Sequence, residues 1–351
     1  MLLKIYRVAK NIYHEISGVW LHKYKVDLGI HDKWSLFKKL KYNRLGFTNE
    51  DYHNFDLKHN DYHDYISFRE RWRLENINGR FAYILGEKLM FERIFGKFIN
   101  VPHINFWVKN GKFIDMDAGE TTDVLSVLKT KGELIAKPTR SVGGGTGIHK
   151  IAFNGQNYSI DGKDCSEDEL VKAVSSWEEY IVVDYIKQAE YSSKIYPETT
   201  NSIRIVTARR KSGDYELLLA FHRFGSDLSR PVDNISSGGL GAFVDIDSGC
   251  LEKAKRKTDP KIMHSVHPDS HGQIEGVAIP NWADIKEKLL HVHRCFPFYV
   301  FLAWDVVVGE NGEPYILEIN RGCDLGVQRA KPLRHEKLGE FMREYGLLDN
   351  R

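Results

Sequence analysis

Two acidic residues and an asparagine near the end of the chain have the types and spacing of a metal site. Asp305 lies in the segment FYVFLAWDVVV, Glu318 and Asn320 lie in PYILEIN, and Asn311-Gly312 separates the two segments. Both segments are apolar and β-forming, and Asn-Gly between such runs is a strong signal for a two-residue hairpin turn. The sequence therefore predicts a hairpin that brings the three polar side chains together.

The turn fixes the register of this hairpin. If Glu310 pairs with Glu313, Asp305 lies directly opposite Glu318, and Asn320 follows on the same face. Opposed carboxylates in a half-buried sheet repel each other unless a cation or a shared proton neutralises them. Oxygen atoms are the ligands of Mg²⁺, so we interpret the trio as a magnesium site, with a solvent-facing or proton-sharing acid pair as the alternative. The alternation of side chains predicts an opposite, apolar face formed by Trp304, Val306, Leu317 and Ile319.

A glycine-rich segment earlier in the chain is a candidate phosphate site. In ELIAKPTRSVGGGTGIHKI, Lys137 ends one predicted strand and the next begins near Ile148. Glycines let the backbone approach an anion, and a nearby lysine adds a charge. The segment is neither a Walker loop nor a dinucleotide fingerprint, and its lysine precedes the glycines, unlike that of a protein kinase. A mobile surface turn is the alternative to a phosphate lid. The expected lid comprises Ser141, Gly143, Gly144, Gly145, Thr146 and Gly147.

Composition excludes several classes of protein. The chain has 351 residues, 42 % of them apolar and 28 % charged, and a net charge of +2, which is too small to indicate a nucleic-acid partner. No apolar run approaches the about 20 residues of a membrane-spanning helix. The first residues lack the pattern of a secretory signal, and the four cysteines lack zinc-site spacing. We therefore expect a cytoplasmic protein of several lobes.

The elements that must position these residues fall into three parts. We expect an N-terminal helical lobe over residues 1–85, an α/β lobe with the glycine loop over 86–180, and a lobe with the metal hairpin over 181–351. One clear helix is predicted over 282–295. Residues 1–45 carry ten Lys/Arg and three acids, and apolar residues recur at helical spacing within 1–24. That segment either packs on the protein or contacts an anionic membrane surface.

The order of these parts resembles the ATP-grasp superfamily of ligases. Over nearly the whole chain, LGFTNEDY, EKLMFERIFGKF, AKPTRSVGGGTGI, NSIRIVT, VDNISSGG and AWDVVV with ILEIN are similar to its sugar-transfer-associated branch, found in surface-polysaccharide gene clusters. The resemblance implies an α+β fold in which two lobes grip ATP beside an N-terminal helical lobe. It also implies a ligase that uses ATP and Mg²⁺ in capsule or O-antigen biosynthesis, in the cytoplasm or at the inner face of the membrane.

The resemblance also implies roles for further residues. Lys88 and Lys137 would contact the nucleotide phosphates. Arg204 would meet the transferring phosphoryl group, a task that suits its rigid fork of donors; an ordinary ion pair is the alternative. Either Glu190 or Asp184 would bind the ribose. Adenine would lie against backbone groups of the hinge formed by Val182, Asp184, Tyr185 and Ile186.

A second glycine segment, PVDNISSGGLG, is where we expect the acceptor substrate, because cationic groups near it suit a carboxylate. A plain turn and a surface charge are the alternatives. ATP-grasp ligases phosphorylate a carboxylate to an acyl phosphate, which an amine then attacks. We therefore expect a carboxylate–amine ligase acting on a sugar acid or an amino acid; a phosphotransferase and a non-catalytic nucleotide- or glycan-binding protein are the alternatives. The candidate acceptor residues are Arg223, Asn234, Ser237, Gly238 and Arg321.

Overall fold

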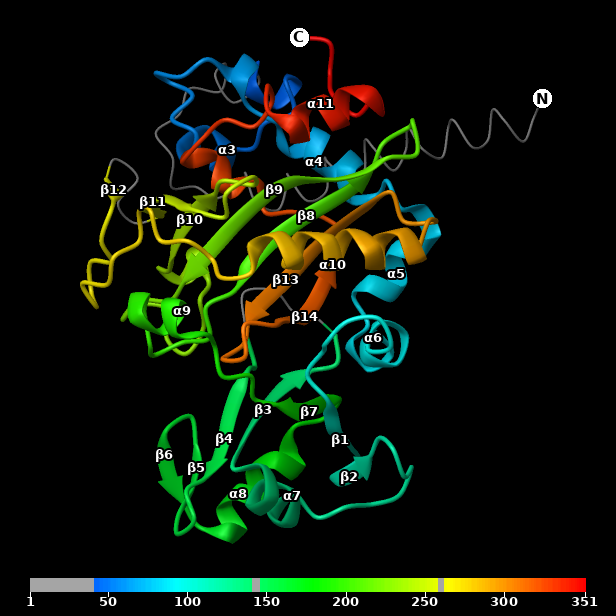
Figure 1. Cartoon of the computed structure of the whole chain (residues 1–351), viewed down its shortest axis with the longest axis vertical. Helices are drawn as coiled ribbons and strands as arrows, with labels where there is room; N and C mark the ends of the chain where they lie inside the picture. The colour runs from blue at the N-terminus through cyan, green and yellow to red at the C-terminus, as the bar shows by residue number, and fades with distance from the viewer. Residues whose placement is uncertain (1–40, 141–145, 258–261) are drawn as a thin grey trace, which may run out of the picture. The chain divides into compact units, whose positions relative to one another are not determined.

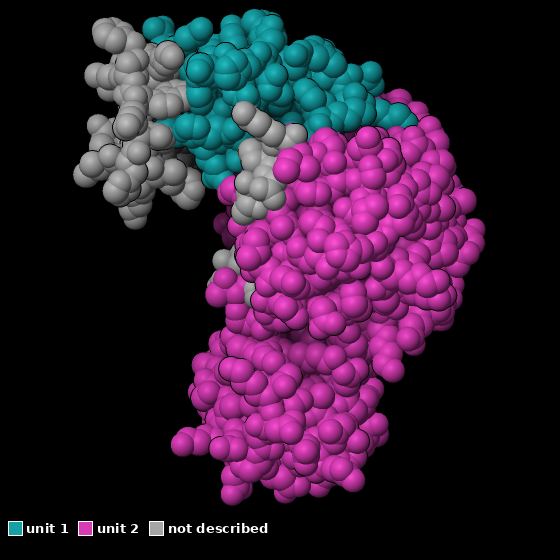
Figure 2. All heavy atoms as spheres, turned by 90° about the vertical axis from the view of Figure 1, so that its left-hand side faces the viewer, with its two compact units in different colours: residues 1–75, 324–351 teal, residues 76–323 magenta. Residues whose placement is uncertain are grey.

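The structure is a computed structural model that describes residues 41–140, 146–257 and 262–351. The chain forms two compact units, one of residues 1–75 with 324–351 and one of residues 76–323, which Figure 2 distinguishes by colour. The expectations for residues 1–24 and for most of the glycine lid lie outside the described residues. Within the described part, no helix is both long and apolar enough to cross a membrane.

The first unit is helical and joins segments from both parts of the chain. Thr48 begins its helix α3 with a capping box, in which its hydroxyl accepts from Asp51 N and the Asp51 carboxylate accepts from Thr48 N. Its aromatic core includes Phe47, Tyr52 and Phe55. The helices of this unit are α3 (Asn49–Asn54), η1 (Tyr62–Asp64), α4 (Phe68–Glu75), η4 (Leu325–Arg329) and α11 (Lys337–Glu344).

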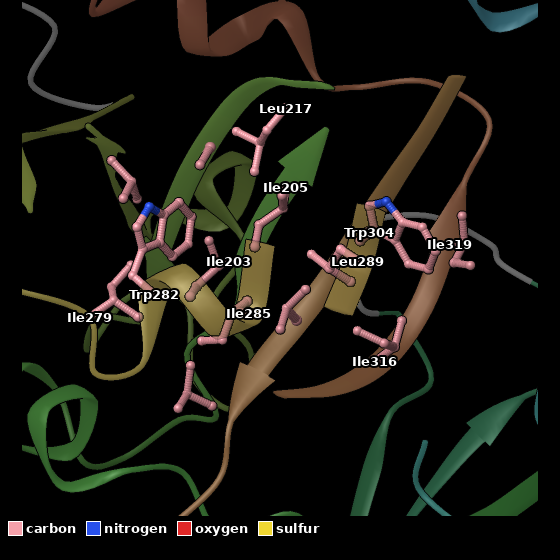
Figure 3. Packing of buried hydrophobic residues seen from close by; sticks show 14 of the residues in the cluster. Ile203, Ile205, Leu217, Ile279, Trp282, Ile285, Leu289, Trp304, Ile316 and Ile319 are labelled. Atoms are coloured by element: carbon pink, nitrogen blue, oxygen red, sulfur yellow. The ribbon is translucent and has the colours of Figure 1, made fainter. Parts of the chain in front are cut away.

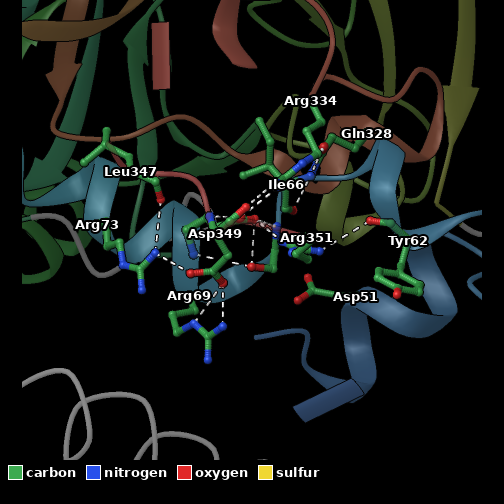
Figure 4. Close-up of polar contacts among 12 residues, drawn as sticks. Asp51, Tyr62, Ile66, Arg69, Arg73, Gln328, Arg334, Leu347, Asp349 and Arg351 are labelled. Atoms are coloured by element: carbon green, nitrogen blue, oxygen red, sulfur yellow. Dashed lines mark hydrogen bonds and ion pairs between the residues drawn. The ribbon is translucent and has the colours of Figure 1, made fainter. Parts of the chain in front are cut away.

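A buried carboxylate ties these segments together, and Figure 4 shows the polar contacts around its partners Arg334, Asp349 and Arg351. Glu70, on α4, is fully buried and accepts hydrogen bonds from Arg334 Nη1 at 2.7 Å and from the Asp349 backbone N–H at 2.7 Å. Arg351 and Ser67 also donate to it. Because a buried charge is tolerated only when it is paired and hydrogen-bonded, these contacts hold residues 324–351 to the helices near the start of the chain.

The smaller part of the second unit is an antiparallel sheet in the order β2-β1-β7-β3-β4-β5-β6 (Figure 1). The helices α7 (Val124–Lys131) and α8 (Glu167–Ser176) pack on this sheet through Val124, Leu128, Leu170 and Val174. Its strands are β1 (Ile104–Lys109), β2 (Lys112–Asp115), β3 (Glu133–Pro138), β4 (His149–Phe153), β5 (Tyr158–Ile160), β6 (Lys163–Cys165) and β7 (Tyr180–Asp184).

The larger part is a second antiparallel sheet, in the order β12-β11-β10-β9-β8-β13-β14. The predicted helix over 282–295 is α10 (Trp282–Cys295), whose apolar stripe covers this sheet (Figure 3). Two antiparallel sheets with helices packed on them confirm the predicted α+β class. The strands are β8 (Ile203–Arg209), β9 (Tyr215–Phe224), β10 (Leu240–Val244), β11 (Leu251–Arg256), β12 (Met263–His264), β13 (Phe301–Val308) and β14 (Pro314–Asn320). The remaining helices are η2 (Gly79–Phe81), α5 (Ala82–Leu85), α6 (Lys88–Phe95), α9 (Glu190–Ile195) and η3 (Ile235–Ser237).

The hairpin of β13 and β14 has the predicted register at the polar trio but not at its turn. Asp305 pairs with Glu318, as predicted. At the turn, however, Gly309 pairs with Glu313, so the loop has one residue more than a two-residue turn. Gly312 takes the left-handed conformation, with φ of 76°, which this loop type requires. A β-bulge next to Asp305 absorbs the extra residue and restores the register.

The bulge corrects one prediction. Leu317, which the strict alternation placed on the apolar face, instead lines a cavity together with Glu318. Ile316 and Ile319 lie in the core. A bulge puts two residues of one strand opposite a single residue of its partner, and here it turns both Leu317 and Glu318 toward the cavity.

Candidate active site

A cavity of about 360 Å³ lies within the second unit, lined by residues of both of its sheets. One end is largely apolar and is formed around the linker that follows β7. Lys150 lies over the Tyr185 ring at 4.1 Å from its centroid and holds that ring by a cation–π contact. An apolar slot of this kind suits a flat heterocycle. This end includes Pro102, Ile135, Ile148, Val183, Tyr185, Ile186 and Leu317.

The other end of the cavity is centred on Asp305, which is 4 % exposed. Strand pairing sets Arg204 on β8 directly beside Asp305 on β13. Arg204 donates from Nε to Oδ1 at 2.5 Å and from Nη2 to Oδ2 at 3.0 Å, while Arg223 Nη2 lies 3.1 Å from Oδ1. Burial alone would raise the pKa of Asp305, but the two guanidinium groups hold it well below its usual range. Asp305 is therefore a carboxylate at neutral pH.

Glu318 and Asn320 complete the predicted trio. The Asn320 amide donates to Asp305 Oδ2 at 3.3 Å and to Glu318 Oε1 at 3.0 Å, and Lys88 Nζ lies 3.7 Å from Glu318 Oε2. The protein's own cations therefore offset the repulsion between the two acids. From the sequence, we expected a metal ion to provide this neutralisation.

The donor set nevertheless fits a hard divalent cation. Two carboxylates and one amide meet within hydrogen-bonding distance, and rotating the Asn320 amide would turn its oxygen toward the carboxylates. Among the described residues, no group of three His, Cys, Asp or Glu side chains is placed to hold a metal ion. The amide of Asn320 is thus the third ligand available to such an ion here.

Two lysines face the acids from the other elements. Lys137, on β3, donates to the Leu317 carbonyl at 3.3 Å. Lys88 begins α6, and its backbone N–H bonds to the Thr139 carbonyl, which fixes the start of the helix beside β3. Burial, with the like charge of Lys88 beside it, lowers the pKa of Lys137 to about 8. Among the described residues, five basic and four acidic side chains line the cavity, an arrangement that suits a polyanion.

Most of the predicted site residues that the structure describes line this cavity. From the predicted nucleotide and metal sets these are Lys88, Lys137, Thr146, Asp184, Tyr185, Ile186, Arg204, Asp305, Glu318 and Asn320, and from the acceptor set they are Arg223 and Asn234. The predictions for Ser141, Gly143, Gly144 and Gly145 fall outside the described residues.

Two of the predicted nucleotide residues lie elsewhere. Glu190 is on α9, and its exposed carboxylate pairs with Lys194 instead of lining the cavity. Of the two candidate ribose ligands, Asp184 lines the cavity. Its carboxylate is held by Asn105 and Lys131. The Val182 side chain is buried in the core of the smaller sheet, and its backbone lies within β7 between β1 and β3.

The second glycine segment mainly builds a turn. Asn234 caps η3, because its side-chain oxygen accepts a hydrogen bond from the Ser236 N–H at 2.9 Å. Asn234 also lines the cavity. Gly238 has φ of 112°, and a Cβ there would lie 2.7 Å from the Leu228 Cβ, so this position requires glycine. Neither Gly238 nor the exposed Ser237 and Arg321 line the cavity. The acceptor role predicted for these three residues therefore lacks support from their positions.

Sequence reasoning missed several residues of the cavity. Ser202 and Asp233 line its polar end, and Leu317 forms part of the apolar end. Asp233 directly precedes the predicted Asn234 in VDNISSGG, so the same motif could have indicated it as a site residue. Ser202 carries no such signal, because it reaches the site only through the pairing of β8 with its neighbours.

Comparison with known proteins identifies the family. The family described as sugar-transfer associated ATP-grasp matches residues 67–336. No curated protein matches the chain.

Three solved structures are similar to this chain. N5-carboxyaminoimidazole ribonucleotide synthetase from Thermotoga maritima has 11 % identity and a TM-score of 0.41, with 76 % of this chain and 50 % of that chain covered. L-amino acid ligase from Bacillus licheniformis has 10 % identity and a TM-score of 0.41, with 76 % and 48 % covered. D-alanine–D-alanine ligase from Bacillus anthracis, complexed with ATP, has 14 % identity and a TM-score of 0.37, with 76 % and 63 % covered. The match thus spans between 48 % and 63 % of the length of these chains.

Proposed function

Because the chain belongs to the sugar-transfer-associated ATP-grasp family, we propose that it is an ATP- and Mg²⁺-dependent ligase that joins a carboxylate to an amine. The observation that carries this proposal is the convergence of Lys88, Lys137, Arg204 and Arg223 on the acidic pair of β13 and β14, at one end of a cavity whose other end is apolar. Adenine fits the apolar end, and the triphosphate fits the basic end.

In this proposal, the side chains divide the phosphoryl transfer between them. Lys88 and Lys137 bind phosphate oxygens. The negative charge of the phosphates offsets the unfavourable free energy of burying these two lysines side by side. Arg204 is oriented by Asp305 on one edge of its guanidinium, so its position is fixed before substrate arrives. A preorganised donor of this kind stabilises charge that develops in the transition state. Arg223 approaches the same carboxylate from β9 and faces the acceptor.

Asp305, Glu318 and Asn320 would hold Mg²⁺. When bound, the ion would neutralise phosphate charge and polarise the phosphoryl group.

The reaction we propose has two steps. First, a carboxylate oxygen of the acceptor attacks the γ-phosphorus, the bond to the β-phosphate oxygen breaks, and ADP leaves. The amine then attacks the carbonyl carbon of the acyl phosphate, and phosphate leaves as the amine loses a proton. Positioning and charge stabilisation by the residues above are sufficient for such transfers, so no covalent nucleophile of the protein is assigned.

The substrates we propose are a sugar acid or an amino acid together with an amine, used in building a surface polysaccharide such as a capsule or O-antigen. This role would place the protein in the cytoplasm, or at the inner face of the membrane, where activated sugars are assembled.

Trapping with hydroxylamine tests the proposal. The protein is incubated with ATP, Mg²⁺, hydroxylamine and panels of sugar acids and amino acids, and hydroxamates are measured by mass spectrometry. We expect an ATP-dependent hydroxamate with one acid, together with ADP and phosphate. A phosphorylated acceptor that accumulates in its place, without hydroxamate or free phosphate, would identify a phosphotransferase. ATP binding without any turnover would indicate a non-catalytic binding protein.

A further inference from the structure

Asp233 lines the cavity, but the ligase mechanism above gives it no role. Its oxygen Oδ2 is anchored: the Ser202 N–H donates to it at 2.8 Å, the Ser202 hydroxyl also donates to it, and Arg223 Nε lies 3.6 Å away. The other oxygen, Oδ1, contacts no donor among the described residues. The side chain is only 15 % exposed, and Oδ1 is the oxygen that it leaves available to a ligand in the cavity.

Arg223 is held in the same manner. Its Nε and Nη2 atoms donate to the Ser202 hydroxyl at 3.1 and 2.5 Å, and Nη2 also contacts Asp305. Its Nη1 atom contacts no acceptor in the part of the chain that the structure describes. Ser202 thus fixes an arginine and an aspartate side by side, and each retains one polar atom for a ligand.

We propose that Arg223 and Asp233 together bind an amino acid as a zwitterion, with its carboxylate on Arg223 and its ammonium on Asp233. This inference rests on the proposed function and names its acid substrate. An acceptor of this class carries opposite charges on neighbouring carbons, and the basic and acidic groups of the pair lie 3.6 Å apart. A sugar acid without an amine would offer no donor to the Oδ1 atom of Asp233, so it would forgo this hydrogen bond.

The orientation follows from Asp305. Arg223 contacts Asp305 through its Nη2 atom at the phosphoryl-transfer end of the cavity, whereas Asp233 lies beside its Nε atom. The carboxylate of the amino acid therefore lies toward the γ-phosphate and becomes phosphorylated. Its own amine is held as an ammonium ion, which has no lone pair for attack. The attacking amine must then come from the second substrate, such as an aminosugar.

Binding measurements test the pair independently of turnover. The wild-type protein, saturated with Mg²⁺ and a non-hydrolysable ATP analogue, is titrated by calorimetry with the proteinogenic amino acids and with matched acids that lack the amine, such as propionate for alanine. We expect at least one amino acid to bind tenfold or more tightly than its matched acid. In Asp233→Asn the amino acid should bind no more tightly than the matched acid, whereas the matched acid should keep its wild-type affinity.

A control separates recognition from a structural role. Asp247→Asn makes the same chemical change at an exposed position outside the cavity and should leave all affinities unchanged. The proposal is overturned if no amino acid binds the wild-type complex, if Asp233→Asn binds amino acids normally, or if it loses both classes of acid equally. The last outcome would mean that Asp233 only holds Arg223.

The hydroxylamine assay distinguishes this inference from the proposed function. Hydroxamate formed from a sugar acid, with no amino acid bound, would retain the ligase and overturn the amino-acid site. Amino-acid binding that depends on Asp233, without any ATP-dependent product, would retain the site and remove the ligase.

Discussion

Asp305 and Glu318 face each other across β13 and β14, and a β-bulge directly beside the pair keeps them in register. The bulge compensates for a turn that is one residue longer than a two-residue hairpin loop. Without it, Leu317 would pair with Asp305, and Glu318 would move to the core face opposite Trp304. The local distortion is therefore part of how the hairpin builds the proposed metal site.

Glu318→Gln tests that site. The amide keeps the shape of the side chain but removes the charge that a divalent cation requires. Because a metal ion supplies several kcal/mol of charge stabilisation, we expect Mg²⁺-dependent ATP turnover to fall by about 100-fold or more. Glu310→Gln, at the exposed turn of the same hairpin, is the matched control. Cooperative urea unfolding of both variants would verify the fold, and wild-type turnover by Glu318→Gln would remove the metal assignment.

Lys137→Ala tests the phosphate end of the cavity. A charge-assisted hydrogen bond contributes roughly 1.5–3 kcal/mol, so we expect ATP to bind about 10- to 150-fold more weakly. Isothermal titration calorimetry with a non-hydrolysable analogue measures this directly. Exposed Lys172→Ala on α8 provides the control. Unchanged affinity in Lys137→Ala would contradict the assignment.

The same lysine predicts how nucleotide binding depends on pH. Its pKa is lowered to about 8 in the free protein, and phosphate oxygens would raise it in the complex. Binding therefore takes up a proton, so affinity is full below pH 8 and decreases as the pH rises above it. Calorimetry from pH 7 to pH 9.5 checks the slope. Lys137→Arg, whose charge persists across this range, should flatten this part of the profile; an equally steep profile would assign the effect to another group.

Arg204 and Asp305 should be coupled in stability as well as in position. Arg204→Met leaves a buried carboxylate with a single guanidinium partner, and we expect the free energy of unfolding to fall by about 3–5 kcal/mol. Asp305→Asn in the same chain removes the unpaired charge and should recover part of that loss. A double-mutant cycle by urea denaturation measures the coupling. Additive losses would show that the ion pair contributes no coupling energy.

Glu70 offers a parallel test in the helical unit. Its carboxylate is fully buried between Arg334 and Arg351, so Glu70→Gln leaves buried guanidinium charge uncompensated. We expect a loss of about 3–5 kcal/mol in unfolding free energy, measured by chemical denaturation. Glu75→Gln, which breaks the more exposed i,i+4 pair with Arg71, should cost less than about 1 kcal/mol. Equal losses would mean that burial does not govern the contribution of Glu70.

The sequence predicted those features that local patterns determine. The amphipathic stripe of α10 and the pairing of Asp305 with Glu318 are confirmed. The pairing follows from a two-residue turn in the prediction, whereas in the structure the turn is one residue longer and the bulge restores the register. Bulges depend on packing across the sheet and leave no residue-level signal, so Leu317 was assigned to the wrong face. The Ser202–Asp233 contact joins residues that are far apart in sequence, and no periodicity indicates it.

The most direct test of the account is the stoichiometry of products. The protein is incubated with ATP, Mg²⁺, amino acids, sugar acids and aminosugars, and all new species are identified by mass spectrometry while ADP and phosphate are quantified. We expect one new amide, with ADP and phosphate each released in an amount equal to that of the amide. ADP formed together with a phosphorylated acceptor, without amide or free phosphate, would contradict the assignment as a ligase.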